Sequence, residues 1–141
     1  MTRHQPTLLY MVKQVELAIR AQLDDVLKPQ GLTTSQYTAM TVLERDPGMT
    51  SAHLARNSFV TAQSMSDVVA PLVDRGLIER HRDPADRRRL VLSLTADGLA
   101  LLDACRGPVT AVQTRMVHGM DAKATAQFGD VLQSCRKNLV D

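Results

Sequence analysis

Apolar residues recur at spacings of three and four in several stretches of this chain, which is the period of an amphipathic helix. The first stretch predicts a long helix over Pro6–Leu27, with Pro6 in its first turn and Pro29 and Gly31 after its end. Its apolar stripe consists of Leu8, Val12, Val15, Ile19, Leu23 and Val26. Because a helix of this length exceeds what so small a domain can cover, we expect part of the stripe to be buried against another chain.

A capping box predicts the start of the second helix. Thr33 supplies the hydroxyl and Gln36 follows three positions later, and the helix is expected to end near Arg45. A short third helix is expected over 52–57, and the two hydroxyl residues directly before it are both candidate caps.

A turn at 58–60 leads to a fourth helix, which Thr61 is expected to cap and Gly76 to end. Pro71 lies late in this helix and is expected to bend it, because proline removes an intrahelical hydrogen bond. A short helix, a brief turn and a second helix with a polar N-terminal face are typical of a helix-turn-helix.

Apolar and polar residues then alternate with a period of two on both sides of a turn, which predicts a two-stranded hairpin. The strands are expected over 77–82 and 89–94, with the turn sequence Asp-Pro-Ala-Asp at 83–86 between them. On the second strand, one face is expected to carry Leu90, Leu92 and Leu94, and the other Val91 and Ser93. A helix-turn-helix followed at once by a hairpin is the order of a winged helix-turn-helix.

Two more helices complete the predicted secondary structure. Thr95 is expected to cap a fifth helix that runs to about His118, with a kink at 107–108 where glycine precedes proline. Asp121 is expected to cap the last helix. Its apolar stripe consists of Phe128, Leu132, Cys135 and Leu139.

The positive charge of the chain is concentrated at the hairpin. Residues 80–89 carry five arginines and two aspartates, a formal charge of +3, whereas the whole chain is +2. The polyanion that most often meets such a basic tip is the DNA backbone. No apolar run approaches the roughly 20 residues of a membrane span. The first six residues lack the apolar region of a signal peptide, so we expect a cytoplasmic protein with no membrane partner.

Short polar side chains at the start of the fourth helix are candidates for reading base edges, since they let the helix enter a groove. At the hairpin we expect Arg88 to reach toward a minor groove, oriented by Asp86. Its neighbours Arg87 and Arg89 are expected to meet phosphates or carboxylates of the chain. The start of the third helix could hold a phosphate. The predicted DNA-binding residues are Ser51, His53, Thr61, Ala62, Gln63, Ser64, Ser66, Arg82, Asp86, Arg87, Arg88 and Arg89.

Other chemistries find less support in the sequence. Two cysteines are too few for a disulfide scaffold. Either Cys105 or Cys135 could make the protein a redox sensor, which is the alternative function, although both lie on apolar stripes where thiols act as small hydrophobes. The four histidines show no ligand spacing, so neither a metal nor a cofactor is predicted. We find no phosphate loop, acid/base pair or nucleophile motif, so no enzyme is predicted. A protein-interaction module without DNA is a further alternative, which the arginine cluster argues against.

Four ordered motifs resemble the multiple-antibiotic-resistance regulator (MarR) family of bacterial transcription factors. The sequence Asp-Pro-Ala-Asp-Arg-Arg at 83–88, followed by Leu-Ser-Leu-Thr-Ala-Asp-Gly at 92–98, is similar to the family's wing motif and the start of its next helix. The segments 31–33 with Gln36, and 76–80, resemble two more signatures. The resemblance covers essentially the whole chain.

The resemblance implies a fold class that is mainly α with a small β-hairpin wing, about six helices in all. It implies a single domain over 1–141, in which 33–95 form the winged helix-turn-helix lobe and 1–29 with 96–141 form the dimerisation helices. A homodimer is expected to bind double-stranded DNA at a pseudo-palindromic operator, usually as a repressor. The recognition helix departs from many relatives at Asp67, where they carry a basic residue and where a carboxylate would repel phosphate unless an arginine pairs with it.

The resemblance also implies a small aromatic or phenolic effector, bound between the dimerisation helices and the DNA-binding lobe. Binding is expected to favour a lobe spacing that no longer fits the operator. The predicted lining residues are Tyr10, Met11, Tyr37 and Met40, and core packing is the alternative role for each.

Overall fold

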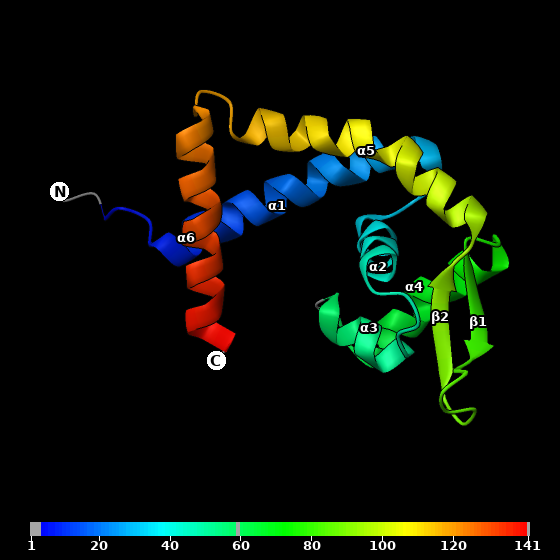
Figure 1. Ribbon diagram of the computed structural model, residues 1–141. Helices are drawn as coiled ribbons and strands as arrows, with labels where there is room; N and C mark the ends of the chain where they lie inside the picture. Colours follow the sequence, from blue (N-terminus) through cyan, green and yellow to red (C-terminus); the bar gives the residue numbers. More distant parts are fainter. Residues whose placement is uncertain (1–3, 59, 141) are drawn as a thin grey trace. The chain divides into compact units, whose positions relative to one another are not determined.

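The computed structural model describes residues 4–58 and 60–140 (Figure 1). In the described residues the helices are α1 (Leu8–Leu27), the short 3₁₀ helix η1 (Lys28–Gln30), α2 (Thr34–Arg45), α3 (Ser51–Asn57), α4 (Ala62–Asp74), α5 (Ala96–Met116) and α6 (Ala122–Val140). The strands β1 (Ile78–Arg82) and β2 (Leu90–Leu94) form an antiparallel hairpin. The predicted fold class is confirmed. Phe59, which belongs to the predicted turn before α4, lies outside the described residues.

Side-chain caps fix where the helices begin. In each case an oxygen of the cap accepts a hydrogen bond from the backbone N–H three positions later, at 2.8–3.2 Å. The caps that the sequence predicted and the structure confirms are Thr33, Thr50, Thr61, Thr95 and Asp121. The predicted start of α1 is wrong: Thr7 caps this helix, and Pro6 precedes the cap. The Thr7 hydroxyl can accept from a free N–H of the first turn, whereas proline offers no such acceptor in its side chain.

A glycine follows the end of α4, whereas the prolines inside α4 and α5 do not end these helices. Gly76 follows α4 with φ of +73°, the left-handed conformation that ends a helix at low cost. The helix α4 continues past Pro71 to Asp74, and α5 continues past Pro108. The helix α5 ends at Met116, two residues earlier than predicted, where a turn leads into Gly119 with φ of +91°.

The hairpin pairs in register from Ile78 opposite Leu94 to Arg82 opposite Leu90. The predicted strands each began one residue too early. The ladder is regular, so side chains of β2 alternate between two faces, but burial does not follow the faces, because Val91 and Leu92 are both buried whereas Leu90 is half exposed. Leu90 pairs with the exposed Arg82 at the end of the ladder, where the hairpin extends beyond the core.

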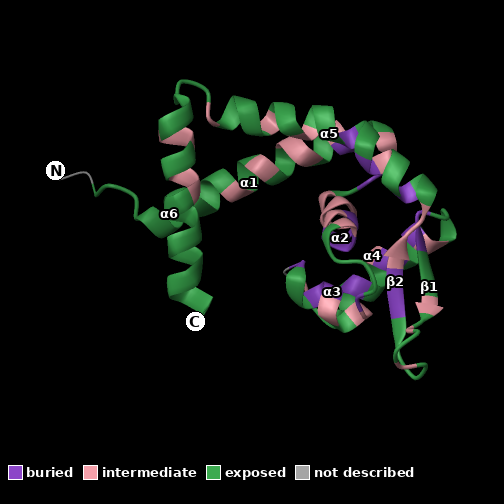
Figure 2. Ribbon diagram, viewed as in Figure 1, coloured by how far each residue is buried: buried purple, intermediate pink, exposed green. Residues whose placement is uncertain are grey.

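The core lies within a compact unit that runs to Val109, and α6 belongs to a second unit that starts at Thr110. Figure 2 shows buried residues in α2, α3, α4 and the hairpin. The largest fully buried side chains include Leu27, Met40, Leu43, Leu54, Met65, Leu72 and Leu102. In contrast, α6 buries none of its described residues. The first unit thus includes α1 and the start of α5 together with the lobe, and the predicted division at residues 29, 33 and 96 stays a prediction.

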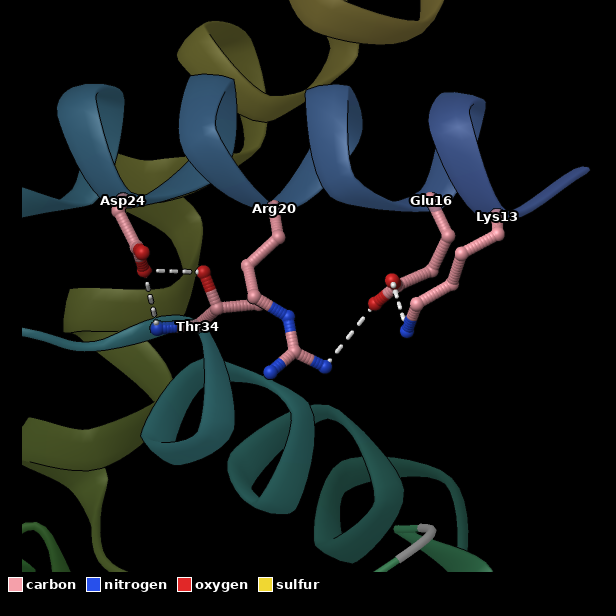
Figure 3. Close-up of polar contacts among 5 residues, drawn as sticks. All are labelled: Lys13, Glu16, Arg20, Asp24 and Thr34. Carbon is pink, nitrogen blue, oxygen red and sulfur yellow. Dashed lines mark hydrogen bonds and ion pairs between the residues drawn. The ribbon is translucent and has the colours of Figure 1, made fainter. Parts of the chain in front are cut away.

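Charged side chains fasten α1 to the lobe within the first unit. The Asp24 carboxylate of α1 accepts hydrogen bonds from the Thr34 backbone N–H at 3.2 Å and from the Thr34 hydroxyl at 2.5 Å, at the start of α2 (Figure 3). From the other side, Arg75 at the end of α4 donates to the carbonyl oxygens of Gly31 at 2.9 Å and Gln30 at 3.2 Å. The Arg75 guanidinium therefore lies at the carbonyls that end η1, and the Asp24 carboxylate lies at the N–H that begins α2. The helix dipoles favour both placements.

Candidate nucleic-acid interface

The helix α4 presents one apolar face and one polar face. Met65, Val69 and Leu72 are buried on the core side. Gln63 and Asp67 each lie two residues from Met65, which turns them about 160° away from it at 100° per residue. Both are exposed. The side of α4 that points away from the core is therefore free to enter a groove.

The five polar or small residues predicted at the start of α4 are all exposed. Three of them are engaged within the helix: the Thr61 hydroxyl donates to Ser64 Oγ at 3.0 Å, and the Ser66 hydroxyl donates to the Ala62 carbonyl oxygen at 3.3 Å. These hydroxyls keep spare acceptor capacity. Gln63 makes no side-chain hydrogen bond within the described part of the chain, so its amide is the group best able to pair with a base edge.

The tip of the hairpin is shaped by two aspartates. The Asp83 carboxylate accepts from the Ala85 N–H at 2.9 Å, and the Asp86 carboxylate accepts from the Arg88 N–H at 3.1 Å. Each is an Asx turn, in which a side chain replaces a backbone acceptor. The Arg89 N–H also donates to the Asp86 carbonyl at 3.0 Å. The tip is thus held by local bonds that need no help from the core.

The arginines of the wing are exposed, although Arg82 also donates a hydrogen bond from Nη1 to the Arg87 carbonyl oxygen at 3.4 Å. Arg82, Arg87, Arg88 and Arg89 are all exposed, and the Arg88 side chain is 95% exposed. The predicted link between Asp86 and Arg88 exists in a modified form: Arg88 Nε lies 3.6 Å from Asp86 Oδ1, which is an ion pair rather than a hydrogen bond. The Asp86 carboxylate instead accepts its hydrogen bond from the Arg88 backbone N–H. Asp86 therefore orients Arg88 mainly by fixing its main chain.

The remaining predicted contacts lie at the start of α3. Ser51 and His53 are half-buried. The His53 N–H is satisfied by the Thr50 hydroxyl at 3.2 Å, so it is not free for a phosphate. The structure therefore places the most accessible candidates on α4 and at the wing. Both elements belong to the first compact unit.

Of the four residues predicted to line an effector site, Tyr10 and Met11 are exposed on α1 and Tyr37 is half-buried on α2. Burial raises the pKa of Tyr37 above its ordinary value, so its hydroxyl stays protonated at neutral pH. Met40 is fully buried in the core. None of the four lines the cleft described next, and their role in effector binding stays a prediction.

A cleft of about 480 Å³ lies between α1, α2 and the turn before α4. It is lined by Glu16, Ile19, Arg20, Leu23, Thr34, Ser35, Thr38, Ser58 and Val60. Ser58 is 93% buried, given its relative exposure of 7%, and its hydroxyl has no hydrogen-bond partner in the described chain. No sequence pattern marked Ser58, because the cleft is formed by three segments far apart in the sequence. Arg20 reaches the same cleft while it pairs with Glu16 at 3.0 Å (Figure 3).

The two cysteines differ in environment. Cys105 is buried, and burial raises the pKa of its thiol, which lowers the thiolate fraction and the reactivity. Cys135, on the predicted apolar stripe of α6, is exposed in the single chain. The described residues contain no group of three or more His, Cys, Asp or Glu side chains placed to hold a metal ion. They also contain no helix with the length and apolar character needed to cross a membrane.

Comparisons with known proteins agree with this geometry. The sequence model of the MarR family matches residues 30–89. The HTH-type transcriptional repressor Rv2887 of Mycobacterium tuberculosis is 32% identical over 124 residues, which cover 88% of this chain and 89% of that protein. None of the similar proteins supports the redox alternative.

Solved structures of relatives share the fold over nearly the whole chain. Rv2887 in complex with DNA is similar with a TM-score of 0.77 at 29% identity, over 93% of this chain and 98% of that one. Its complex with salicylic acid has a TM-score of 0.76 at 30% identity, over 93% and 97% of the two chains. CouR from Rhodococcus jostii RHA1, bound to p-coumaroyl-CoA, has a TM-score of 0.81 at 25% identity over 89% of each chain. The winged helix-turn-helix and this similarity over most of its length show that the chain belongs to the MarR family of transcriptional regulators.

Proposed function

We propose that this protein is a homodimeric repressor that binds a pseudo-palindromic operator and is released from it by a small organic acid. The observation that carries the proposal is the combination of a free polar face on α4 with a rigid, arginine-bearing wing in one compact unit. The similar protein Rv2887 is a repressor with a DNA complex. The function is one of binding, with no catalytic step.

The apolar surface of α1 and α6 supports the homodimer. On α1, the large apolar residues that are exposed in the single chain are Leu8, Leu9, Tyr10, Met11, Val12, Val15 and Leu17. On α6 they are Val131, Leu132, Leu139 and Val140. Large exposed apolar patches are rare on monomeric proteins and mark interaction sites. A second copy would cover these faces and place two recognition helices about one helical turn of DNA apart, roughly 34–36 Å.

Selection of bound fragments from a random duplex pool tests the DNA-binding proposal. We expect two inverted half-sites whose centres are about 10 base pairs apart. The affinity for the selected duplex should fall steeply with salt, by roughly 0.9 log units per phosphate contact for each log unit of salt concentration. A pool without enrichment, or a duplex affinity insensitive to salt, would refute the proposal. Sedimentation of the free protein tests the dimer, and a monomer at micromolar concentration would refute it.

We propose the cleft beside Ser58 as the effector site. Its apolar side chains from α1 suit a small hydrocarbon body, while Arg20 and the unpaired Ser58 hydroxyl suit a carboxylate and its neighbouring oxygen. The similar protein Rv2887 binds salicylic acid. Because the cleft touches both α1 and the turn that precedes α4, an occupant would bias the position of the recognition helix relative to the dimer.

Salicylate is a suitable probe for this site. It should release the protein from its selected duplex at millimolar or lower concentration, and Arg20→Ala should raise the concentration needed several-fold without changing the affinity for DNA in its absence. Arg45→Ala removes the same charge from the exposed end of α2, outside the lining of the cleft, and is the matched control. Equal salicylate sensitivity of the Arg20→Ala variant and the wild type would refute this site.

A further inference from the structure

The polar face of α4 is unusual in its charge. From Thr61 to Asp74 the sequence contains no lysine and no arginine. The next residue, Arg75, has its guanidinium engaged with the Gln30 and Gly31 carbonyls. The face that points away from the core therefore offers no cation to pair with guanine, which is the commonest specific contact in the major groove.

Asp67 occupies the centre of this face. It lies two residues from both Met65 and Val69, which are buried, so it points almost directly away from the core. It is exposed, and it forms no ion pair within the described part of the chain. The arginine partner that would have withdrawn Asp67 from DNA is thus not present in the described residues.

An ionised carboxylate only accepts hydrogen bonds. In the major groove guanine presents two acceptors, and thymine presents an acceptor and a methyl group, so both repel a carboxylate. The cytosine N4 amino group is a donor with no acceptor beside it on that edge, and it is the usual partner of aspartate and glutamate. Adenine offers a donor beside an acceptor and suits an amide such as Gln63 better.

We infer that Asp67 is a specificity-determining residue that selects a cytosine in each half-site, close to an adenine selected by Gln63. Gln63 and Asp67 are four residues apart and so lie about 6 Å apart along the helix axis, at 1.5 Å per residue. This separation corresponds to nearly two base-pair steps of about 3.4 Å. The adenine and the cytosine therefore lie one or two steps apart. The inference rests on the proposed binding of operator DNA.

The experiment compares duplex pools selected by the wild-type protein, Asp67→Ala and Asp67→Asn. The wild type should select a cytosine at a fixed position, and replacing that C·G pair should weaken its binding at least fivefold per half-site, the lower end of the roughly 1–3 kcal/mol for one base contact. In Asp67→Ala this penalty should fall below twofold. Asp67→Asn should shift the preference at this position to adenine, because an amide pairs with the adenine edge.

Asp74→Asn is the matched control. Asp74 lies on the same exposed side of α4 but at its C-terminal end, whereas base contacts come from the N-terminal part of a recognition helix. Its removal changes the net charge as Asp67→Asn does, and it should leave the selected motif unchanged. The inference is overturned if wild type and Asp67→Ala select the same motif, or if wild type selects no cytosine. If wild type enriches no motif at all, the proposed function falls with it, whereas an unchanged motif in Asp67→Ala overturns only the role of Asp67.

Discussion

Replacement of Asp86 by alanine separates two effects that act in opposite directions on DNA binding. The substitution removes a negative charge from the tip of the wing, and the reduced repulsion of a phosphate about 7 Å away would favour binding by ~0.6 kcal/mol in water. It also removes the acceptor that fixes the Arg88 N–H at 3.1 Å. If only charge mattered, Asp86→Ala would therefore bind DNA more tightly than wild type.

The loss of the acceptor that fixes the Arg88 backbone should outweigh the gain from removing the charge. The hydrogen bond from the Arg88 N–H to Asp86 keeps the Arg88 main chain in the turn. Without it, the freed residue must be ordered again on binding, at a cost of roughly 1.5 kcal/mol. The exposed ion pair between the two side chains adds little, since Arg88 is 95% exposed. After the gain in charge is subtracted, each wing loses about 0.9 kcal/mol and the dimer about twice that, which corresponds to roughly 20-fold weaker binding.

A mobility-shift titration of the selected duplex at fixed salt measures this change. Asp86→Asn is the matched variant, because its side-chain oxygen can still accept from the Arg88 N–H while the charge is lost. We expect it to bind up to about sevenfold more tightly than wild type, because the dimer loses ~1.2 kcal/mol of repulsion while the turn is kept. The reasoning is refuted if Asp86→Ala binds as tightly as wild type or more tightly, since the turn would then contribute nothing to the placement of Arg88.

Three further predictions follow from other parts of the molecule. Arg88→Ala should weaken operator binding at least tenfold and leave the sedimentation of the dimer unchanged, whereas Arg136→Ala on α6 loses the same charge and should bind normally; equal affinities would contradict the role of the wing. Gly98→Ala should lower the unfolding temperature by about 10 °C, because the added carbon would lie 2.2 Å from the Leu77 carbonyl oxygen and such overpacking costs about 3 kcal/mol. A calorimetric midpoint within 2 °C or so of wild type would contradict this prediction. Burial raises the pKa of the Cys105 thiol, so the unfolded chain loses this proton at lower pH than the folded chain, and stability should fall as pH rises above about 9, where the unfolded thiol ionises. Between pH 8 and pH 10, the free energy of unfolding measured in urea should fall less in Cys105→Ala than in wild type.

The local elements could be read from the sequence because they depend on neighbours in the chain. The cap at Thr33 and the turn at Asp83–Asp86 are formed by hydrogen bonds that span two or three residues. The same is true of the left-handed Gly76 at the end of α4. Period and turn chemistry therefore identified the winged helix-turn-helix, its free polar helix face and its arginine tip.

Contacts between segments far apart in the chain could not be predicted from the sequence. The hydrogen bonds from Arg75 to the Gln30 and Gly31 carbonyls join residues more than 40 positions apart. The unpaired Ser58 hydroxyl lines a cleft only because α1 passes beside it. The burial of Val91 could not be predicted for the same reason, since alternation indicates two faces but not how far the core reaches along them. The sequence by itself determined which elements form and where they begin, because local hydrogen bonds decide this. Only the tertiary structure decided which polar groups are withdrawn by a partner and which, like Asp67, are left free to bind.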